Sequence, residues 1–278
     1  MHRDPLSLLK RAKTKGNQKL DQYFITDEGV LDRLQGYACE LGRGHVLEIG
    51  PGIGNLTHKL IEISKQVTAV EIDPYLVNFL TNEFECEIKS KKLNLVQGDF
   101  MKIEVPVCDS SISNLPYEKS SQILFNLLPR KIPLILMVQK EFAQRLVARP
   151  NTPEYGRLSI TSNHYAKIEV LECVSPTAFN VHPAVESAII RSVPHEPNYE
   201  IVDENLFFAL VTAAFTQRRK KMSNAIKNTT HITKFKYPHE IISVAEKWMM
   251  DSRPGELTPE NFAELTDKIF EIERAEKQ

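Results

Sequence analysis

The fold is decided by the stretch HVLEIGPGIG at residues 45–54, in which a short apolar run leads into alternating glycines. Such a run is typical of a buried strand in a parallel sheet, and the glycines allow a tight turn into a helix at about 55–64. The next strand, 67–73, ends in an acidic segment, and Pro74 suits the first turn of the following helix. This part of the chain therefore predicts alternating strands and helices.

The alternation continues beyond this segment. Strands are expected at 93–99, 110–115 and 133–139, with a helix at 120–128 before the last of them. Such alternation indicates a doubly wound α/β sheet, whose ligands bind at the carboxyl ends of the strands. Glu71, Asp99 and Asn114 all fall at such ends.

The last part of the chain has a different pattern. Two strand-like runs at 167–174 and 185–193 predict an antiparallel hairpin that closes the sheet, and residues 194–197 indicate a linker. Beyond the linker we expect a small all-α domain. Its predicted helices lie at 203–215, 217–227, 238–250 and 258–272.

Length and composition fit this division. The chain has 278 residues, of which 42% are hydrophobic and 26% charged, enough for one large domain and a smaller one. We expect a basic tail at 1–18, an α/β domain at 19–194 and a helical domain at 195–278.

Neither export nor membrane insertion is predicted. The longest apolar run, 132–138, is far shorter than the ~20 residues that a membrane-spanning helix needs, and residues 1–4 carry no secretory stretch. The 4 cysteines are scattered without a Cys-x-x-Cys pair, so neither a disulfide framework nor a metal site is indicated. A cytoplasmic monomer is expected.

Charge is unevenly distributed although the net charge is only −1. No acidic residue lies between Glu204 and Glu240, and the densest basic run there is Arg218, Arg219, Lys220 and Lys221. A basic stripe in a near-neutral protein indicates a polyanion partner, whereas the alternative is a solvated helix face. Charge alone does not decide between them.

The glycine loop and two carboxylates predict the cofactor. Gly50, Gly52 and Gly54 let the backbone approach a ligand, but the dinucleotide fingerprint wants a further glycine where Asn55 stands. Glu71, at a strand end, can accept bonds from both ribose hydroxyls of an adenosine, and Asp99 at the next strand end can accept from an adenine amine. Each carboxylate alone is better explained by a solvated strand end or a helix cap. Together on successive strands they favour S-adenosylmethionine.

The segment Asn114-Leu115-Pro116-Tyr117 predicts the chemistry. An exocyclic adenine nitrogen is a poor nucleophile because its lone pair is delocalised into the ring. If the Asn114 oxygen and a carbonyl of Leu115 or Pro116 accept hydrogen bonds from the two N–H groups of this amine, the nitrogen lone pair can point at a sulfonium methyl. Tyr117 would stack on the flipped-out base. The alternative is a simple turn, which Asn and Pro both favour.

These motifs, in this order, resemble those of the KsgA-type small-subunit ribosomal RNA adenine dimethyltransferases, and most closely the archaeal members. The likeness covers roughly residues 19–223. Its motifs are Asp21-Gln22-Tyr23-Phe24-Ile25, the 48–54 loop, Glu71-Ile72-Asp73, Gly98-Asp99, Asn114 to Tyr117, Tyr155-Gly156-Arg157-Leu158-Ser159, Ala178-Phe179 and Glu186-Ser187-Ala188.

The resemblance implies a Rossmann-like class I methyltransferase fold and a set of site residues. The substrate would be two adjacent adenines in the 3′-terminal hairpin loop of small-subunit rRNA, dimethylated at N6 during ribosome biogenesis. The implied catalytic residues are Asn114, Leu115, Pro116, Tyr117 and Phe179, with the two aromatic rings on either side of the base. The implied cofactor-binding residues are Gln22, Tyr23, Ile25, Glu48, Gly50, Gly52, Gly54, Glu71, Ile72, Asp99, Phe100 and Asn114. The basic run 218–221 would contact rRNA.

Two positions depart from the family pattern. Tyr23 stands where Asn or His is usual, and Ala184 lies where a basic residue is often found. Other functions remain possible on the residues alone: an adenine methyltransferase acting on large-subunit rRNA, or an assembly factor that acts mainly by binding. A DNA adenine methyltransferase is disfavoured, because those enzymes commonly have two prolines where this chain has Leu115-Pro116.

Overall fold

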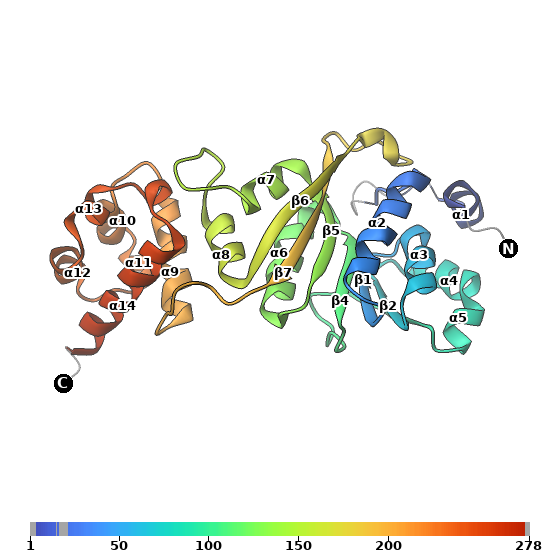
Figure 1. The fold of residues 1–278 in the computed structure, drawn as a ribbon, viewed down its shortest axis with the longest axis horizontal. Helices are drawn as coiled ribbons and strands as arrows, with labels where there is room; N and C mark the ends of the chain where they lie inside the picture. Colours follow the sequence, from blue (N-terminus) through green and yellow to red (C-terminus); the bar gives the residue numbers. More distant parts are fainter. Residues whose placement is uncertain (1–3, 15, 17–21, 276–278) are drawn as a thin grey trace. The chain divides into compact units, whose positions relative to one another are not determined.

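A mixed sheet organises the first part of the chain, with the strand order β3-β2-β1-β4-β5-β7-β6 (Figure 1). The computed structural model describes residues 4–14, 16 and 22–275. Strands β1 to β5 are parallel, and β7 is antiparallel to β5. The predicted doubly wound α/β sheet is therefore confirmed. The strands are β1 (His45–Ile49), β2 (Gln66–Glu71), β3 (Leu93–Gln97), β4 (Ser110–Asn114), β5 (Leu134–Gln139), β6 (Ala166–Val174) and β7 (Ser187–Pro194).

The strand order places a ligand-binding edge between β1 and β4. The chain passes from β1 outward to β2 and β3, then returns to β4 on the other side of β1. At such a topological switch point the connections leave in opposite directions, and their divergence opens a crevice at the carboxyl ends of the strands. A buried hydrogen bond of 2.8 Å from the Ile49 amide to the Ser113 hydroxyl joins the two strand ends there.

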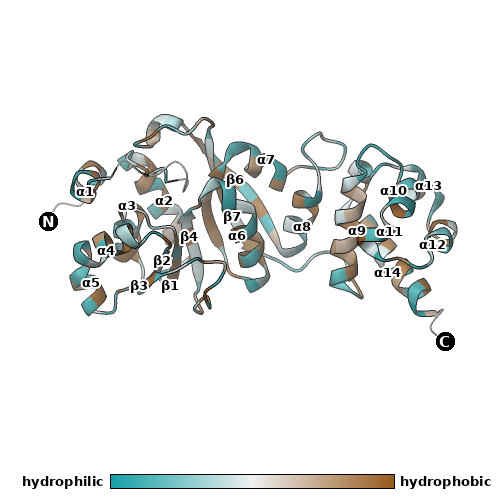
Figure 2. Cartoon of the chain, turned by 180° about the vertical axis from the view of Figure 1, so that it is seen from behind, coloured by the Kyte–Doolittle hydropathy of each residue, from teal (hydrophilic) through white to brown (hydrophobic). Residues whose placement is uncertain are grey.

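The helices around the sheet bury an apolar core. Hydrophobic residues are concentrated in the strands of the sheet (Figure 2), where fully buried residues such as Val67, Ile112, Ile135 and Ile189 meet. The helices of this part are α1 (Pro5–Ala12), α2 (Glu28–Glu40), α3 (Asn55–Ile63), α4 (Pro74–Glu83), α5 (Glu85–Lys89), α6 (Ser120–Leu127) and α7 (Lys140–Leu146). Among the described residues, no helix has the length and apolarity to cross a membrane.

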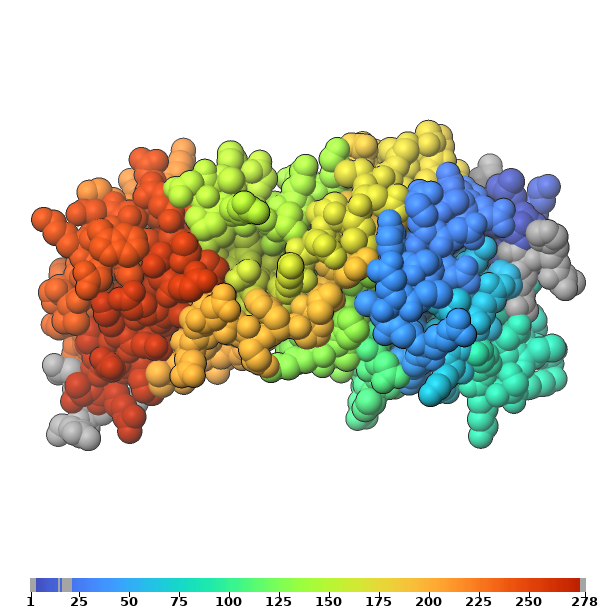
Figure 3. All heavy atoms as spheres, in the orientation of Figure 1, coloured from blue at the N-terminus to red at the C-terminus, as the bar shows by residue number. Residues whose placement is uncertain are grey.

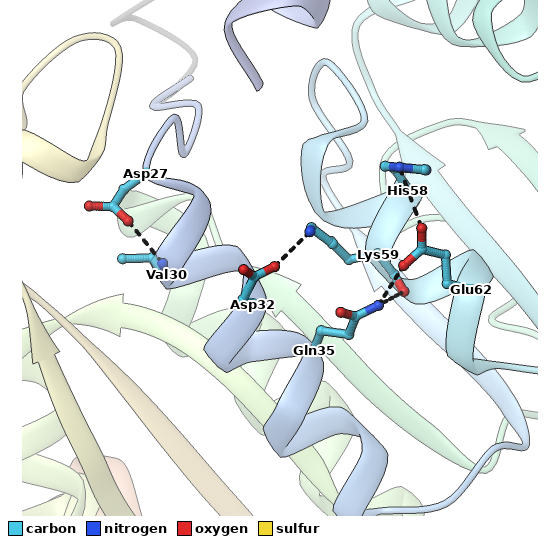
Figure 4. Close-up of polar contacts among 7 residues, drawn as sticks. All are labelled: Asp27, Val30, Asp32, Gln35, His58, Lys59 and Glu62. Atoms are coloured by element: carbon cyan, nitrogen blue, oxygen red, sulfur yellow. Dashed lines mark hydrogen bonds and ion pairs between the residues drawn. The ribbon is translucent and has the colours of Figure 1, made fainter. Parts of the chain in front are cut away.

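Helix α2 is fixed to its neighbours by polar contacts. Asp27 caps its first turn by accepting from the Val30 amide, and Asp32 pairs with Lys59 of α3 at 2.6 Å (Figure 4). Gln35 donates to the Lys59 carbonyl and to Glu62 on α3. On its other side α2 lies beside β6, seen as blue beside yellow in Figure 3, where an ion pair joins Arg33 to Glu172. The helix that follows the glycine loop is thus held in place from outside the sheet.

The segment expected as a basic tail contains a packed helix. Asp4 caps α1 by accepting from the Ser7 amide, and the apolar side of the helix buries Leu8 and Ala12. These residues form a small cluster with Phe24, Ile53 and Leu76. The basic residues alone suggested a tail, but Arg11 is partly buried and pairs with Glu83 at 2.8 Å.

Residues 144–167 and 195–278 form a second compact unit, and the first consists of 1–143 and 168–194. The second unit resumes at residue 195, within the predicted linker. It also includes residues 144–167, which the sequence assigned to the α/β domain at 19–194. The reason is packing, since Tyr155 and Ile160 belong to the apolar cluster of the C-terminal helices. The helices of this unit are α8 (Arg157–Tyr165), α9 (Glu204–Thr216), α10 (Met222–Asn228), α11 (Thr230–Thr233), α12 (Pro238–Val244), α13 (Lys247–Asp251) and α14 (Pro259–Ala275).

Candidate functional site

A pocket opens at the switch point between β1 and β4. Most of the predicted cofactor residues line it: Gln22, Tyr23, Ile25, Glu48, Gly50, Gly52, Glu71, Ile72 and Asn114. A neighbouring cavity of about 490 Å³ shares Gly50, Glu71, Ile72 and Pro116 with it, and adds Asp99 and Phe100. The two cavities together bring predicted residues from four strand ends to one place. Asp21 lies outside the described residues.

The glycine loop has the backbone conformation that its sequence demands. Gly50, Gly52 and Gly54 have φ angles of 71°, 60° and 86°, which side chains with a Cβ rarely adopt. Only the first two line the pocket. A Cβ on Gly54 would lie 2.6 Å from the Phe84 ring, so this glycine serves helix packing rather than ligand approach. Helix α3 begins directly after it without a side-chain cap, which leaves amide groups at its start for an anionic group.

Glu71 is the carboxylate between the two cavities. It is buried, and its two oxygens accept from the amides of Gly52 and Asp73 at 3.1 and 2.9 Å. Burial raises the pKa of Glu71, and these backbone bonds oppose the rise. Each oxygen keeps further acceptor capacity, so the carboxylate can both hold the glycine loop and accept from ligand hydroxyls.

Asp99 is more open than Glu71. Its side chain is 34% exposed, and it lies 3.5 Å from the ammonium of Lys102. One oxygen accepts from the Met101 amide, which fixes the turn after β3. Together with Phe100 and Ile123 it lines the larger cavity, so this carboxylate lies beside apolar side chains.

Three buried acceptor atoms along the first pocket have no hydrogen-bond partner among the described residues: Glu48 Oε2, Asn55 Oδ1 and Asn114 Oδ1. Buried polar atoms are almost always paired, so these atoms indicate a ligand that brings N–H groups. An ammonium and an amine fit them, while the start of α3 fits a carboxylate. The methionine end of S-adenosylmethionine carries an ammonium and a carboxylate, so the residues fit this cofactor.

Glu48 has a strongly shifted pKa. Burial raises the pKa of its carboxyl to about 8, the Thr57 hydroxyl opposes the shift, and the charge of Glu71 adds to it. The group is therefore mostly protonated at neutral pH.

Asn114 is placed at the end of β4 with its amide in a defined orientation. Its Nδ2 donates to the Tyr23 carbonyl at 3.1 Å. Because a carbonyl can only accept, this bond fixes which end of the amide is the oxygen. The free Oδ1 is thereby left as an acceptor at the pocket wall.

The three residues after Asn114 differ in exposure. The Leu115 side chain is fully buried and lines neither cavity, while Pro116 lines both. The Pro116 carbonyl accepts from the Lys119 amide and the Ser120 hydroxyl. Tyr117 is partly buried, and its hydroxyl lies 2.6 Å from that of Ser187 on β7.

Residues 22–27, here called the cover segment, are tied to the pocket at several points. Gln22 donates to Asp73 at 2.9 Å, and the carbonyl of Ile25 accepts from Asn55. Phe24 exchanges two hydrogen bonds with Asn180, and a Cβ on Gly52 would lie 2.9 Å from the Phe24 ring. The segment therefore lies directly against the glycine loop.

Phe179 is not placed as the sequence predicts. Its side chain is only 2% exposed and packs in the core with Ile25, Val30 and Val174. Its backbone forms a bridge to Ile25 next to the hydrogen bonds that hold the cover segment. In this structure the ring supports the cover segment from inside and does not offer a face to a base.

The basic run 218–221 lies on a turn before α10 rather than inside the helix expected at 217–227. The Arg218 guanidinium donates to the Thr152 carbonyl at 3.0 Å, and Lys221 pairs with Asp251 at 2.9 Å. Arg219 and Lys220 are exposed. Two of the four cations are thus engaged within the second unit.

Sequence reasoning missed Asn55 and Ser187. Asn55 was noticed only as a break in a dinucleotide fingerprint, although its position as the first residue of α3 after a glycine loop already placed it beside the ligand. Ser187 was quoted in a motif without a role. Nothing in the sequence pairs it with Tyr117, which lies 70 positions away.

Comparisons with known proteins agree with this site. A family model described as ribosomal RNA adenine dimethylase matches residues 13–267. A protein of Natronomonas pharaonis named "Probable ribosomal RNA small subunit methyltransferase A" is 48% identical over 98% of this chain and 99% of its own length. One of Haloarcula marismortui with the same name is 44% identical over 99% and 97%.

Solved structures point the same way. A dimethyladenosine transferase from Plasmodium falciparum superposes with a TM-score of 0.73 at 28% identity, covering 87% of this chain and 95% of that one. The 23S rRNA methyltransferase ErmE gives 0.64 at 25%, covering 89% and 99%. Enzymes of the matched family take their methyl groups from S-adenosylmethionine, the cofactor that the pocket fits. Because the family model spans nearly the whole chain, this chain belongs to the ribosomal RNA adenine dimethylase family.

Proposed function

We propose that this enzyme dimethylates N6 of two adjacent adenines in the 3′-terminal hairpin loop of small-subunit rRNA, acting as a cytoplasmic monomer during ribosome biogenesis. The proposed reaction is supported mainly by the Oδ1 atom of Asn114, which has no hydrogen-bond partner among the described residues and lies at the wall of the cofactor pocket. The small-subunit target is supported by the names of the archaeal relatives, which align over almost the entire chain.

Asn114 and a neighbouring carbonyl would position the nucleophile. Asn114 Oδ1 accepts one N–H of the adenine amine. The second acceptor is the Leu115 carbonyl rather than that of Pro116, because the latter already accepts from Lys119 and Ser120. Two bonds to fixed acceptors direct the nitrogen lone pair into the pocket. This is catalysis by orientation and preorganised electrostatics.

When bound, S-adenosylmethionine supplies a methyl group on a positively charged sulfur. Asn114 and the Leu115 carbonyl would align the N6 lone pair with that methyl group, and solvent would take the proton that N6 gives up. Glu71 and Asp99 would hold the ribose and the adenine of the cofactor, and Glu48 and Asn55 would accept from its ammonium. Tyr117 would stack on the target base, a contact worth ~1–3 kcal/mol in single-strand binders.

Arg219 and Lys220 are the cations of the basic run that we assign to rRNA phosphates. Both are exposed, whereas Arg218 and Lys221 are engaged with Thr152 and Asp251. Their removal is expected to weaken binding to the subunit without touching the pocket. Phosphate contacts of this kind set register and affinity rather than sequence choice.

The test is methylation of isolated ribosomal subunits. The enzyme is incubated with labelled S-adenosylmethionine and unmethylated small subunits, and modified adenines are mapped by mass spectrometry. We expect dimethyladenine at two adjacent positions of the 3′-terminal hairpin. Analytical ultracentrifugation of the enzyme alone tests whether it is a monomer in solution.

A second candidate is methylation of large-subunit rRNA. It is favoured by the likeness to the 23S rRNA methyltransferase ErmE, which covers 89% of this chain. Large subunits are therefore incubated in parallel. If the label is found on large-subunit RNA and not on small-subunit RNA, the small-subunit proposal is wrong and the second candidate is supported.

A further inference from the structure

The ring of Tyr23 lies against the ring of Tyr117. Their centroids are 5.4 Å apart and their planes differ by 22°, which is an offset stack. Tyr23 lines the cofactor pocket together with Asn114 and Pro116. One face of Tyr117 is therefore covered by a side chain that also borders the place where the methyl group is delivered.

The backbone of Tyr23 is held independently of its ring. Its carbonyl accepts from Asn114 Nδ2 at 3.1 Å, and the next residue, Phe24, is anchored by two hydrogen bonds with Asn180. Phe24 is buried, whereas the Tyr23 side chain is only partly buried. The contact that orients Asn114 therefore does not involve the Tyr23 ring, which stacks on Tyr117 and packs at the edge of the apolar core.

The target base and the Tyr23 ring require the same place. A base whose amine reaches Asn114 Oδ1 and whose ring stacks on Tyr117 must lie beside the Asn114 amide and parallel to the Tyr117 ring. The Tyr23 ring is stacked on Tyr117, and Tyr23 lines the same pocket as Asn114, so on this face of Tyr117 the ring lies where such a base would go. Two rings 5.4 Å apart leave no room for a third between them, because two stacking distances need roughly 7 Å.

We propose that the Tyr23 ring is a placeholder for the target adenine, which displaces it from the face of Tyr117 before methyl transfer. The inference rests on the proposed roles of Asn114 and Tyr117. Tyr23 is accordingly a residue that sets how readily a base enters the acceptor site. Tyr117 itself stays in place during the exchange, since the Ser187 hydroxyl binds its hydroxyl.

Replacing the Tyr23 ring by the base should be favourable in free energy, but breaking the tyrosine stack should lower kcat/KM. Base stacking on an aromatic ring is generally stronger than a pair of partly exposed aromatic side chains. The tyrosine stack is nevertheless present in the free enzyme and absent in the transition state. Removing it should raise kcat/KM, which depends on the difference between these two states.

The test compares Tyr23→Leu with Tyr23→Phe. Leucine keeps an apolar side chain but has no flat ring, and phenylalanine keeps the stack. With unmethylated small subunits as substrate, we expect kcat/KM of Tyr23→Leu to exceed that of Tyr23→Phe, which keeps the stack, by about two- to tenfold. Because Tyr23 lines the cofactor pocket, affinity for S-adenosylmethionine is measured by calorimetry in all three proteins, and kcat/KM is compared with the cofactor at saturation. Tyr23→Met is measured alongside in case the branched side chain perturbs folding.

A double-variant cycle shows whether the effect passes through Tyr117. In a Tyr117→Ala background the change at Tyr23 should no longer raise kcat/KM, because no stack remains to be broken. If Tyr23→Leu and Tyr23→Met are as slow as Tyr23→Phe or slower, the ring supports the site rather than occupying it, and the placeholder role is wrong. Full activity of Asn114→Ala would instead contradict the proposed function itself.

Discussion

At the scale of single residues, the reaction depends on an oxygen atom that is kept unpaired. Asn114 uses its nitrogen to bind the Tyr23 carbonyl, so the bond that fixes the amide also leaves Oδ1 as a free acceptor. The cost of an unpaired buried acceptor in the free protein becomes a contribution to binding when a donor arrives. The contact matters most when the target nitrogen is aligned with the methyl group.

Asn114→Ala should therefore reduce methyl transfer far more than cofactor binding. We expect kcat to fall by about 10²–10³, the range for loss of one preorganised contact in an active site. Affinity for S-adenosylmethionine should change much less, because Asn114 is one of many residues that line the cofactor pocket and Glu48, Asn55 and Glu71 are retained. Single-turnover methylation and calorimetry measure the two quantities. A variant that methylates at the parent rate would remove Asn114 from the mechanism.

The raised pKa of Glu48 should make the stability of the folded protein depend on pH. Its pKa is about 8 in the folded protein against an ordinary value of 4.5, so the folded state holds a proton that the unfolded state releases between these values. The free energy of unfolding should therefore fall as pH rises from about 4.5 to about 8, by at most ~1.4 kcal/mol per pH unit, and then level off.

Glu48→Gln isolates this effect, because glutamine has the shape of the protonated acid and no charge. Urea unfolding at pH 5, 6, 7, 8 and 9 should show the parent losing stability relative to the variant up to pH 8. Parallel curves for the two proteins would mean that Glu48 is already ionised in the folded state.

At the scale of elements, the sequence predicts those strands and helices whose signal is local. Strands β1 to β5 were found within a few residues, since buried runs and glycines mark their ends. Helix α2 was not assigned, although Asp27 and the spacing of Val30, Leu34 and Ala38 are a helix signal. The burial of Phe179 and the anchoring of Arg218 could not be predicted, because they depend on segments far apart in the chain.

Arg218 illustrates this dependence. Its guanidinium binds the Thr152 carbonyl and lies within 4 Å of where a Cβ of Gly156 or Gly255 would be. The Asn151 amide in turn donates to the Gly255 carbonyl. Three separate segments of the second unit therefore meet at one cation, which makes Arg218 a structural residue within a run that looks uniformly suited to bind RNA.

Arg218→Ala should accordingly destabilise the protein, and Arg219→Ala should not. Loss of a hydrogen bond from a charged group costs about 1.5–3 kcal/mol, whereas an exposed substitution stays within about 0.5 kcal/mol. Urea unfolding of the two neighbouring variants provides a matched comparison. Equal stability of both would show that the Thr152 contact contributes nothing.

At the scale of the whole molecule, the proposed chemistry and the proposed RNA contact belong to different units. All residues of the cofactor pocket lie in the unit formed by 1–143 and 168–194, and the basic turn lies in the other. Substrate affinity and the rate of methyl transfer should therefore respond to different substitutions. A substitution in the basic turn should alter substrate affinity alone, and a substitution in the pocket should alter the rate of methyl transfer.

The double variant Arg219→Ala/Lys220→Ala tests this separation. We expect a higher KM for small subunits, an unchanged kcat and an unchanged affinity for S-adenosylmethionine. If both cations contact phosphates, the slope of log affinity against log salt should become shallower by about 1.4–1.8. The control is Arg43→Ala/Lys65→Ala, which removes the same charge from exposed positions at the amino ends of β1 and β2, the opposite edge of the sheet from the pocket. An equal loss in both double variants would mean that total charge, rather than the basic turn, governs binding to the subunit.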